Sequence, residues 1–210
     1  MTSTNPDRNC PLCPRLVAFR QKARAKNPDW HNAPVPSFGE ATARLLIVGL
    51  APGMQGANRS GRPFTGDYAG DLLYETLQAY GFSSGTYDER PDDGLTLQDA
   101  KITNAVRCVP PENKPVGAEI TSCRPYLIAT MEEMPRLKAV LALGRIAHES
   151  LLRTLEQPLA RFPFKHGAAH RIGKLTLFDS YHCSRYNTNT RRLTPAMLQS
   201  VFSDIREMLG

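Results

Sequence analysis

Short runs of branched apolar residues, separated by segments with helical spacing, constrain this chain more than any other feature. The clearest run is Leu-Leu-Ile-Val-Gly-Leu at positions 45–50, which has the length and composition of a strand buried on both faces of a parallel sheet. Further runs of this character occupy positions 102–106, 137–143 and 175–178. The sequence therefore predicts a sheet of short buried strands.

Helical spacing separates these runs. Apolar residues recur at helical intervals between positions 72 and 80, and Gly81 is placed to end that helix. The last helix has the clearest signals, because Thr194 suits an N-cap and Pro195 the first helical position. Two more helices are expected at 118–134 and 145–156. This alternation predicts a three-layer α/β/α fold, with ligands bound at loops beyond the carboxyl ends of the strands. Three such loops start at Ala51, Arg107 and Asp179 and are expected to converge on one site.

Composition narrows the class of protein. With 210 residues, 41% hydrophobic and 22% charged, the chain fits one globular domain, which we place at 1–210 with an N-terminal arm at 1–40. No apolar run approaches the roughly 20 residues that span a bilayer. The polar start, Met1 to Asn9, lacks the apolar core of a signal peptide, so we expect a cytoplasmic protein. A net charge of +6 favours an acidic partner such as nucleic acid.

The five cysteines are an odd number in a chain expected to stay in a reducing compartment, which makes a disulfide framework unfavourable. Cys10 and Cys13 have the two-residue separation that lets two thiolates reach one metal centre. Cys108 and Cys123 lie 15 positions apart, which weakens a zinc-ribbon interpretation and favours a cluster with ligands from distant segments. From spacing alone, Cys108 and Cys123 are equally well explained as small core residues. We interpret Cys183 as a packing residue.

Two polar loops carry candidate site residues. The loop from Gly49 to Asp67 follows a buried strand, but it lacks the Gly-Lys-Ser/Thr ending of a phosphate loop and the spacing of a dinucleotide fingerprint, so nucleoside triphosphate use has no support. The loop from 181 to 192 is polar and basic, as suits contact with a phosphate backbone. Taken alone, His182 in this loop fits a structural role as well as a catalytic one. The other histidines, His31, His148, His166 and His170, have no motif around them and are expected to be solvated or in the core, and 83–99 is expected to be a surface loop.

In their order along the chain, several motifs resemble the uracil-DNA glycosylase superfamily, and within it the iron-sulfur type B branch, often called family 5. The matching segments are Gly49-Leu50-Ala51-Pro52-Gly53, then 58–67 (NRSGRPFTGD), 103–115 (TNAVRCVPPENKP), 142–145 (ALGR), and Tyr181-His182-Cys183-Ser184-Arg185 with Asn187. The resemblance implies a four-stranded parallel sheet between helices. It also implies a structural 4Fe-4S cluster on Cys10, Cys13, Cys108 and Cys123.

The same resemblance implies residue roles for hydrolysis of the bond between a flipped base and deoxyribose. Phe64 would stack on the base, Asn104 would recognise its edge, and His182 would hydrogen-bond the base oxygen that gains negative charge, helped by the backbone at Gly49 and Ala51. Asp67 would stabilise the sugar cation and orient water, a role compatible with capping the helix that follows. Where other branches carry an acidic or amide residue early in the first motif, this chain has Leu50 and Ala51.

The function implied is a monofunctional DNA glycosylase of base excision repair, because no lysine is placed as a Schiff-base nucleophile. Uracil is the expected substrate, together with other deaminated or damaged bases such as hypoxanthine, xanthine and etheno-cytosine. The partner would be single- or double-stranded DNA, bound by a monomer associated with the nucleoid. The phosphate contacts would come from Arg59, Arg62, Arg185, Arg191 and Arg192. The alternative is an iron-sulfur or zinc module of the same fold that binds nucleic acid without hydrolysis.

Overall fold

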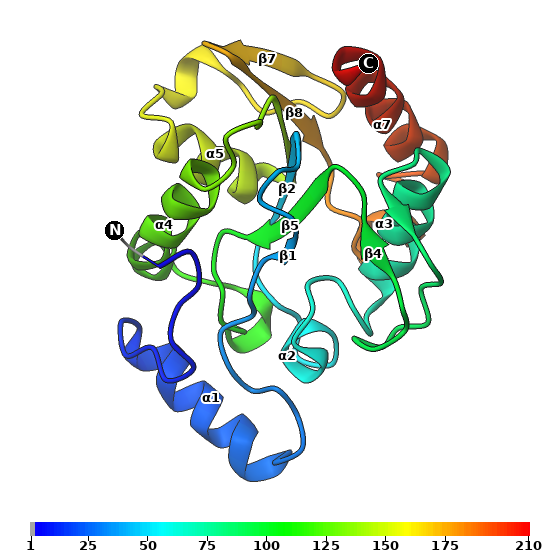
Figure 1. The fold of residues 1–210 in the computed structure, drawn as a ribbon. Coiled ribbons are helices and arrows are strands. Elements are labelled where there is room, and N and C mark those ends of the chain that lie inside the picture. The colour runs from blue at the N-terminus through cyan, green and yellow to red at the C-terminus, as the bar shows by residue number, and fades with distance from the viewer. Residues whose placement is uncertain (1–2) are drawn as a thin grey trace.

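A mixed six-stranded sheet forms the centre of the computed structural model, which describes residues 3–210. The strand order is β1-β5-β2-β6-β8-β7 (Figure 1). The four inner strands are parallel, and the edge strands β1 and β7 are antiparallel to their neighbours. The inner strands are β2 (Leu45–Gly49), β5 (Ala100–Asn104), β6 (Ala139–Leu143) and β8 (Leu175–Ser180). The predicted α/β/α architecture with a four-stranded parallel core is therefore confirmed.

Both edge strands are additions to the predicted sheet. Strand β1 (Phe38–Gly39) has only two residues, too few to show a period, and β7 (Ala169–Ile172) alternates between exposed and half-buried positions, so it has no apolar run. Strand β5 begins at Ala100, two residues before the predicted start at 102. The difference arises at Lys101, whose buried ammonium group is paired with Glu133 at 2.8 Å.

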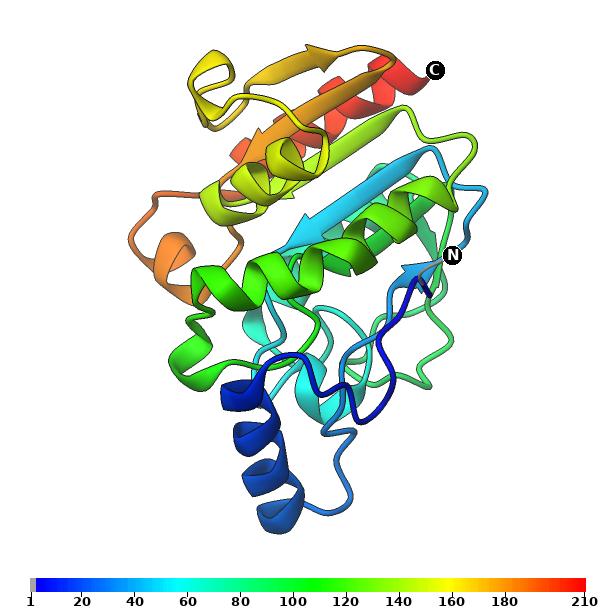
Figure 2. The same cartoon turned by 90° about the vertical axis from the view of Figure 1, so that its left-hand side faces the viewer.

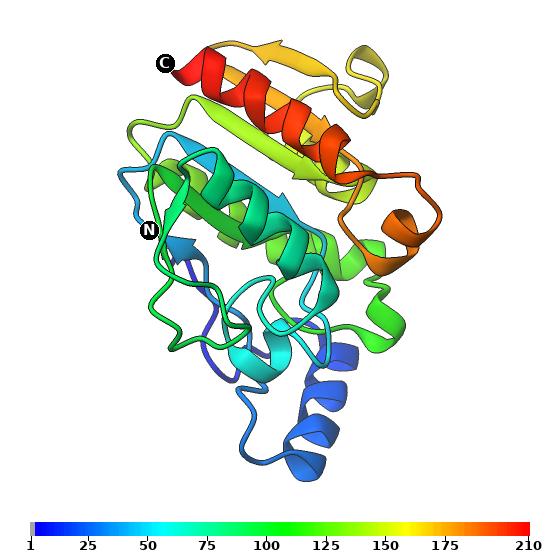
Figure 3. The same cartoon turned by 90° about the vertical axis from the view of Figure 1, so that its right-hand side faces the viewer.

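Helices cover both faces of the sheet. Helices α4 (Gly117–Glu132) and α5 (Arg145–Thr154) lie over one face (Figure 2), and α3 (Tyr68–Ala79) and α7 (Pro195–Leu209) lie over the other (Figure 3). Successive strand residues point to opposite faces and fill two cores: Leu45 and Ile47 belong to the core under α3 and α7, whereas Leu46 and Val48 belong to the one under α4 and α5. Thr194 caps α7, since its side chain accepts from the Met197 N–H.

The remaining elements lie at the ends and edges of this core. Helix α1 (Pro14–Lys26) lies below the sheet in all three views, and its buried residues are Leu16, Arg20 and Ala23. Short helices α2 (Ala57–Ser60) and α6 (Arg185–Asn189) and the 3-10 turns Pro111–Asn113 and Leu159–Arg161 occur in the connections. The segment 83–99, predicted as a surface loop, includes a small hairpin of β3 (Ser83–Ser84) and β4 (Thr96–Leu97). Within residues 3–210, no helix has the length and apolar character needed to cross a bilayer.

Candidate functional site

A cavity of about 510 Å³ opens beyond the carboxyl ends of the parallel strands. Its lining includes five residues singled out from the sequence, which are Ala51, Phe64, Asp67, Asn104 and His182. Asn104 ends β5, and the other four lie in the segments that follow β2 and β8. Asn113, from the loop that starts at Arg107, also lines the cavity, so the three loops expected to converge do so. Arg185 also lies on the cavity wall, whereas Arg59 and Arg191 do not.

The register of β2 and β5 places Gly49 beside Asn104, as the last pair of that parallel ladder. Gly49 has no room for a side chain, because an added methyl group would overlap Asn104 Oδ1 and come within 2.7 Å of the Phe64 ring. Asn104 is only 4% exposed, and among the described residues its amide has no hydrogen-bond partner. An amide offers both donors and an acceptor, so Asn104 is free to pair with a planar polar ligand in the cavity.

Phe64 has an unusual backbone conformation for an aromatic residue, with φ of 52°. Its side chain is almost fully buried, and its ring centroid lies 5.8 Å from that of His182 with 31° between the planes. A left-handed residue with a bulky side chain costs on the order of 1–3 kcal/mol, and such conformations are held by the surrounding structure, commonly at functional sites. The two rings form one wall of the cavity.

Asp67 caps α3 and lines the cavity at the same time. Its Oδ1 accepts a hydrogen bond from the Gly70 N–H at 3.3 Å, while its Oδ2 faces Gly53 and Gly56. A methyl group at Gly56 would overlap this carboxylate, so the glycines allow the loop to close around it. Burial raises the pKa of Asp67 above its ordinary value, although N–H groups of Gly70 and Ala69 partly oppose the shift. The hydrogen bond from the Gly70 N–H confirms the predicted capping role of Asp67.

His182 follows β8 and is a neutral imidazole at physiological pH. Burial lowers its pKa to about 4, because no nearby carboxylate offsets the lost hydration of the charged ring. The ring has no hydrogen-bond partner among the described residues, and the backbone is held by Asn187, whose amide donates to the His182 carbonyl at 2.8 Å. A neutral ring donates one proton without presenting a charge.

A buried cluster of two histidines and a carboxylate was missed by the sequence reasoning. Asp179 Oδ1 lies 2.7 Å from His148 Nδ1, and Asp179 Oδ2 lies 3.1 Å from His170 Nε2. His148 Nε2 also lies 2.9 Å from the Phe162 carbonyl, so both of its nitrogens face oxygen acceptors, an arrangement that favours the doubly protonated ring. Burial opposes this charge, but Asp179 outweighs it and raises the pKa of His148. The signal that could have revealed this cluster was Asp179 itself, because a carboxylate in a buried strand needs a partner.

We expect Asp179→Asn to lower the free energy of unfolding by about 3 kcal/mol below neutral pH, because it leaves a buried imidazolium without its counter-charge. The raised pKa of His148 means that this contribution is complete below the unfolded value of 6.5 and is lost as pH rises through the folded value. Urea unfolding at several pH values measures both effects. Asp204→Asn, at an exposed position of α7, is the control and should change stability by less than about 0.5 kcal/mol. An equal loss at all pH values would contradict the assignment.

Four cysteines from three separate segments line one small cavity. Cys13 is the N-cap of α1, Cys10 lies just before it, Cys108 follows β5, and Cys123 is in α4. Arg20 Nη1 lies 3.6 Å from Cys108 Sγ, and the Arg107 backbone N–H donates to Cys123 Sγ at 3.3 Å. In the part of the chain that the structure describes, the thiols do not approach within 4.8 Å as a group, whereas the ligand atoms of His148, His170 and Asp179 do. The latter three are already joined by short hydrogen bonds.

The predicted phosphate-binding arginines differ in their surroundings. Arg59, Arg185, Arg191 and Arg192 are exposed. The Arg185 guanidinium lies 5.3 Å from the Tyr68 ring and that of Arg192 lies 4.7 Å from the Tyr181 ring. The side chain of Arg62 is only 6% exposed and is paired with Asp93. The prediction that Arg62 contacts a DNA phosphate is therefore wrong, because its guanidinium is already engaged inside the protein.

Comparison with known proteins adds an independent finding. A profile of the Uracil DNA glycosylase superfamily matches residues 36–206. A type-5 uracil-DNA glycosylase of Thermus thermophilus is 42% identical, with 96% of this chain and 94% of the relative covered. A type-5 enzyme of Mycobacterium leprae is 41% identical, with 96% and 92% covered. A type-4 uracil-DNA glycosylase of Pyrobaculum aerophilum is 29% identical, with 97% and 89% covered.

Proposed function

This chain belongs to the uracil-DNA glycosylase superfamily, in its type-5 branch, and from that premise we propose that it hydrolyses the bond between uracil and deoxyribose in DNA at the 510 Å³ cavity. The observation that carries the proposal is the convergence of Phe64, Asp67, Asn104 and His182 on that one cavity. An aromatic face and an amide suit stacking and hydrogen bonding of a flipped base, and an imidazole and a carboxylate suit the chemistry of bond cleavage.

Base recognition falls to Phe64 and Asn104. The Phe64 ring forms a cavity wall on which a flipped base would stack, an interaction worth about 1–3 kcal/mol per base. The Asn104 amide, at the end of β5, has no hydrogen-bond partner in residues 3–210, so it could pair with a base edge that offers a donor and an acceptor. Both residues are buried by the fold itself, so their positions do not depend on a ligand.

His182 stabilises the departing base. When the glycosidic bond breaks, electrons move onto the base, and a hydrogen bond from His182 to a base oxygen strengthens as the charge grows. The neutral ring suits this role. It donates a hydrogen bond without protonating the base and without repelling the cationic sugar. Backbone N–H groups near Ala51, on the same cavity wall, would add to this stabilisation.

Asp67 acts on the sugar and the water. The sugar gains positive charge as the bond breaks, and a carboxylate close by stabilises that charge and accepts a proton from the attacking water. The capping bond uses Oδ1, which leaves Oδ2 facing the glycine-lined side of the cavity. No lysine is among the described residues that line the cavity, which supports hydrolysis over a Schiff-base mechanism.

The cavity supports a broader substrate range than uracil. Its volume of about 510 Å³ lies within the range of sites that hold drug-sized ligands, so a purine fits by size. At positions 50 and 51, Leu50 and Ala51 contribute no polar side chain to the cavity lining that would select one base edge. We therefore include hypoxanthine and xanthine among the proposed substrates, and etheno-cytosine as a further candidate.

A release assay tests the function. Oligonucleotides that each contain one uracil, hypoxanthine, xanthine or etheno-cytosine are incubated with the protein, and free base and intact abasic strand are measured separately. We expect free base from the uracil strand, with no strand cleavage until alkali is added. Tight binding to uracil DNA without any release would instead support the non-hydrolytic binding module. Cleavage without alkali would contradict the monofunctional assignment.

We propose that Cys10, Cys13, Cys108 and Cys123 hold a 4Fe-4S cluster, because all four line one small cavity. Four thiolates are the ligand set of such a cluster. The four thiols do not gather within 4.8 Å of one another as a group, which suits a multi-atom cluster better than a single zinc ion, whose sulfur ligands lie about 2.3 Å from the metal. Arg20 lines the same cavity, is 3% exposed and has an unpartnered Nε, as suits a site for an anionic group. The cluster would be structural and would join α1 to α4.

We expect Cys108→Ala to reduce bound iron to a small fraction of the wild-type amount and to remove the brown colour, because one of four ligands is lost. Cys183→Ala is the control, since Cys183 is another free cysteine, more deeply buried than Cys108, that does not line the cysteine cavity, and it should keep its iron. Metal analysis and visible absorbance of protein purified without air give the readout. Colourless, iron-free wild-type protein would contradict the cluster, and stoichiometric zinc would support the zinc alternative.

DNA binding is proposed to involve the exposed arginines. Arg185 lies on the cavity wall, and Arg59, Arg191 and Arg192 are exposed on segments that lead to it or away from it. Contacts of this kind neutralise phosphates, so affinity should fall with rising salt, and each arginine replaced should reduce the salt slope by about one. The positive net charge of +6 also favours binding to the negatively charged DNA backbone. We propose that the protein acts on DNA as a monomer.

A further inference from the structure

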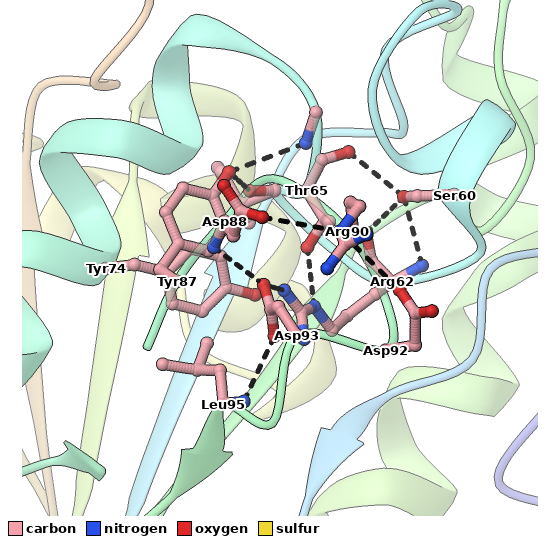
Figure 4. Close-up of polar contacts among 12 residues, drawn as sticks. Ser60, Arg62, Thr65, Tyr74, Tyr87, Asp88, Arg90, Asp92, Asp93 and Leu95 are labelled. Atoms are coloured by element: carbon pink, nitrogen blue, oxygen red, sulfur yellow. Dashed lines mark hydrogen bonds and ion pairs between the residues drawn. The ribbon is translucent and has the colours of Figure 1, made fainter. Parts of the chain in front are cut away.

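Arg62 and Asp93 form a buried ion pair, and contact with DNA does not explain why it is there. Arg62 Nη1 donates to Asp93 Oδ1 at 2.8 Å and Nη2 donates to Oδ2 at 2.7 Å (Figure 4). The two side chains are 6% and 1% exposed. A bidentate pair is both strong and directional, so it fixes the orientation of the segments that carry it. These segments are the loop that contains Phe64 and the segment between β3 and β4.

Asp93 organises its own segment as well. Backbone N–H groups of Asp88 and Leu95 each donate to its carboxylate at 3.0 Å, so the chain turns around this side chain. On the other side of the pair, Arg62 Nε donates to Thr65 Oγ1 at 2.7 Å. The ion pair therefore connects a folded turn to the residue directly after Phe64.

Two tyrosine hydroxyls hold the peptide groups on either side of Phe64. Tyr74, in α3, donates to the Pro63 carbonyl at 2.6 Å, and Tyr87 donates to the Phe64 carbonyl at 3.2 Å. The Gly66 N–H lies 3.4 Å from the Tyr87 hydroxyl oxygen. The two rings are 4.5 Å apart and lie beside the Arg62 guanidinium, at 5.6 and 5.9 Å (Figure 4).

Space around the Phe64 carbonyl and the Tyr87 hydroxyl is limited. A methyl group at Gly70 would overlap the Phe64 carbonyl oxygen and press on the Tyr87 hydroxyl. Phe64 itself keeps a φ of 52°, which the isolated chain would rarely adopt. The hydrogen bonds and the ion pair are the interactions that offset the cost of this conformation.

We propose that Tyr87 and Asp93 are positioning residues for base excision, which hold Phe64 in the left-handed conformation that directs its ring into the cavity. The inference rests on the proposed stacking role of Phe64. It also assigns a function to the segment 85–95, which contributes no residue to the cavity lining. Tyr87 acts on the Phe64 peptide directly, and Asp93 acts through Arg62 and Thr65.

A double-mutant cycle tests the role of Tyr87, because it separates an effect transmitted through Phe64 from a general loss of structure. Tyr87→Phe removes one oxygen and should lower the single-turnover rate of uracil release about fivefold, the value of one hydrogen bond. In the Phe64→Ala background, the same change should lower the rate less than about twofold. Equal losses in both backgrounds, or no loss with Phe64 present, would overturn the inference. If Phe64→Ala keeps the wild-type rate, the stacking role fails and this inference fails with it, whereas uracil release by the wild-type protein is unaffected by either result.

Asp93→Asn provides a second test with a matched control. The Asp99 carboxylate also accepts two hydrogen bonds from one arginine: the backbone N–H of Arg44 donates to Oδ1, and its side-chain Nε donates to Oδ2. Asp99, however, lies before β5, at the opposite end of the sheet. Both Asp93→Asn and Asp99→Asn should lower the urea midpoint. Only Asp93→Asn should lower the rate of uracil release, on the order of tenfold, at a temperature where both variants are folded. Equal rates in the two variants would overturn the role of Asp93.

Discussion

Replacing Asp67 with asparagine is expected to slow uracil release by about two to four orders of magnitude while the protein stays folded. Asparagine caps helices about as well as aspartate, so the bond to the Gly70 N–H is kept and the free energy of unfolding should change by less than about 1 kcal/mol. What the variant loses is the carboxylate charge beside the sugar and the acceptor for the water proton. Single-turnover base release and urea unfolding measure the two effects separately.

The pH dependence of the same reaction provides a sharper test of Asp67. Its pKa is raised above the ordinary 3.8 by burial, so the carboxylate form is lost, and the rate falls, as pH decreases through a midpoint above that value. His182 remains neutral down to about pH 4 and adds no transition above it. The residual activity of Asp67→Asn should lack the transition. Asp71→Asn, one turn later on the exposed surface of α3, should keep the rate near neutral pH and move the transition to lower pH, because the Asp71 charge is one of the causes that raise the pKa of Asp67. A wild-type midpoint below 3.8 would contradict the assignment.

His182→Ala is expected to reduce the rate of uracil release roughly a hundred- to a thousand-fold, because it removes a donor to the oxygen that gains charge in the transition state. Affinity for uracil DNA should fall much less, since the hydrogen bond is weak before the charge develops. Single-turnover rates and equilibrium binding to the same oligonucleotide separate the two quantities.

His31→Ala is the control for this variant. His31 is also a half-buried histidine whose pKa is lowered by burial, but it does not line the cavity. Its removal should leave the rate within about twofold of wild type. Parallel losses of rate and affinity in His182→Ala would assign the residue to ground-state binding and contradict the transition-state role.

The parallel core was predictable because its signal is local. Residues 45–50 and 137–143 are apolar over a whole strand length, and this occurs where both faces of a sheet are covered. The edge strands were not predictable in the same way. Strand β7 has one covered face and polar neighbours, and β1 is two residues long, so neither has a distinctive composition.

Candidate site residues were predictable where they stand at the ends of predicted strands. Asn104 ends β5 and His182 follows β8 after one residue, so placing the strands also placed these side chains. Arg62 shows where that reasoning fails. Its neighbours resemble a DNA-binding loop, and nothing near it in sequence indicates Asp93, which lies 31 positions away.

The sequence by itself determined the four inner strands and the helices that cover them, the loops that carry Phe64, Asp67 and His182, and the two-residue spacing of Cys10 and Cys13, because each of these is set by residues close together in the chain. Only the tertiary structure decided that Arg62 is an internal residue held by Asp93, that Asp179 pairs with His148 and His170, and that four distant cysteines share one cavity. The physical reason is that the charge state and partners of a buried polar group depend on which segments pack around it. That packing is a property of the folded chain as a whole.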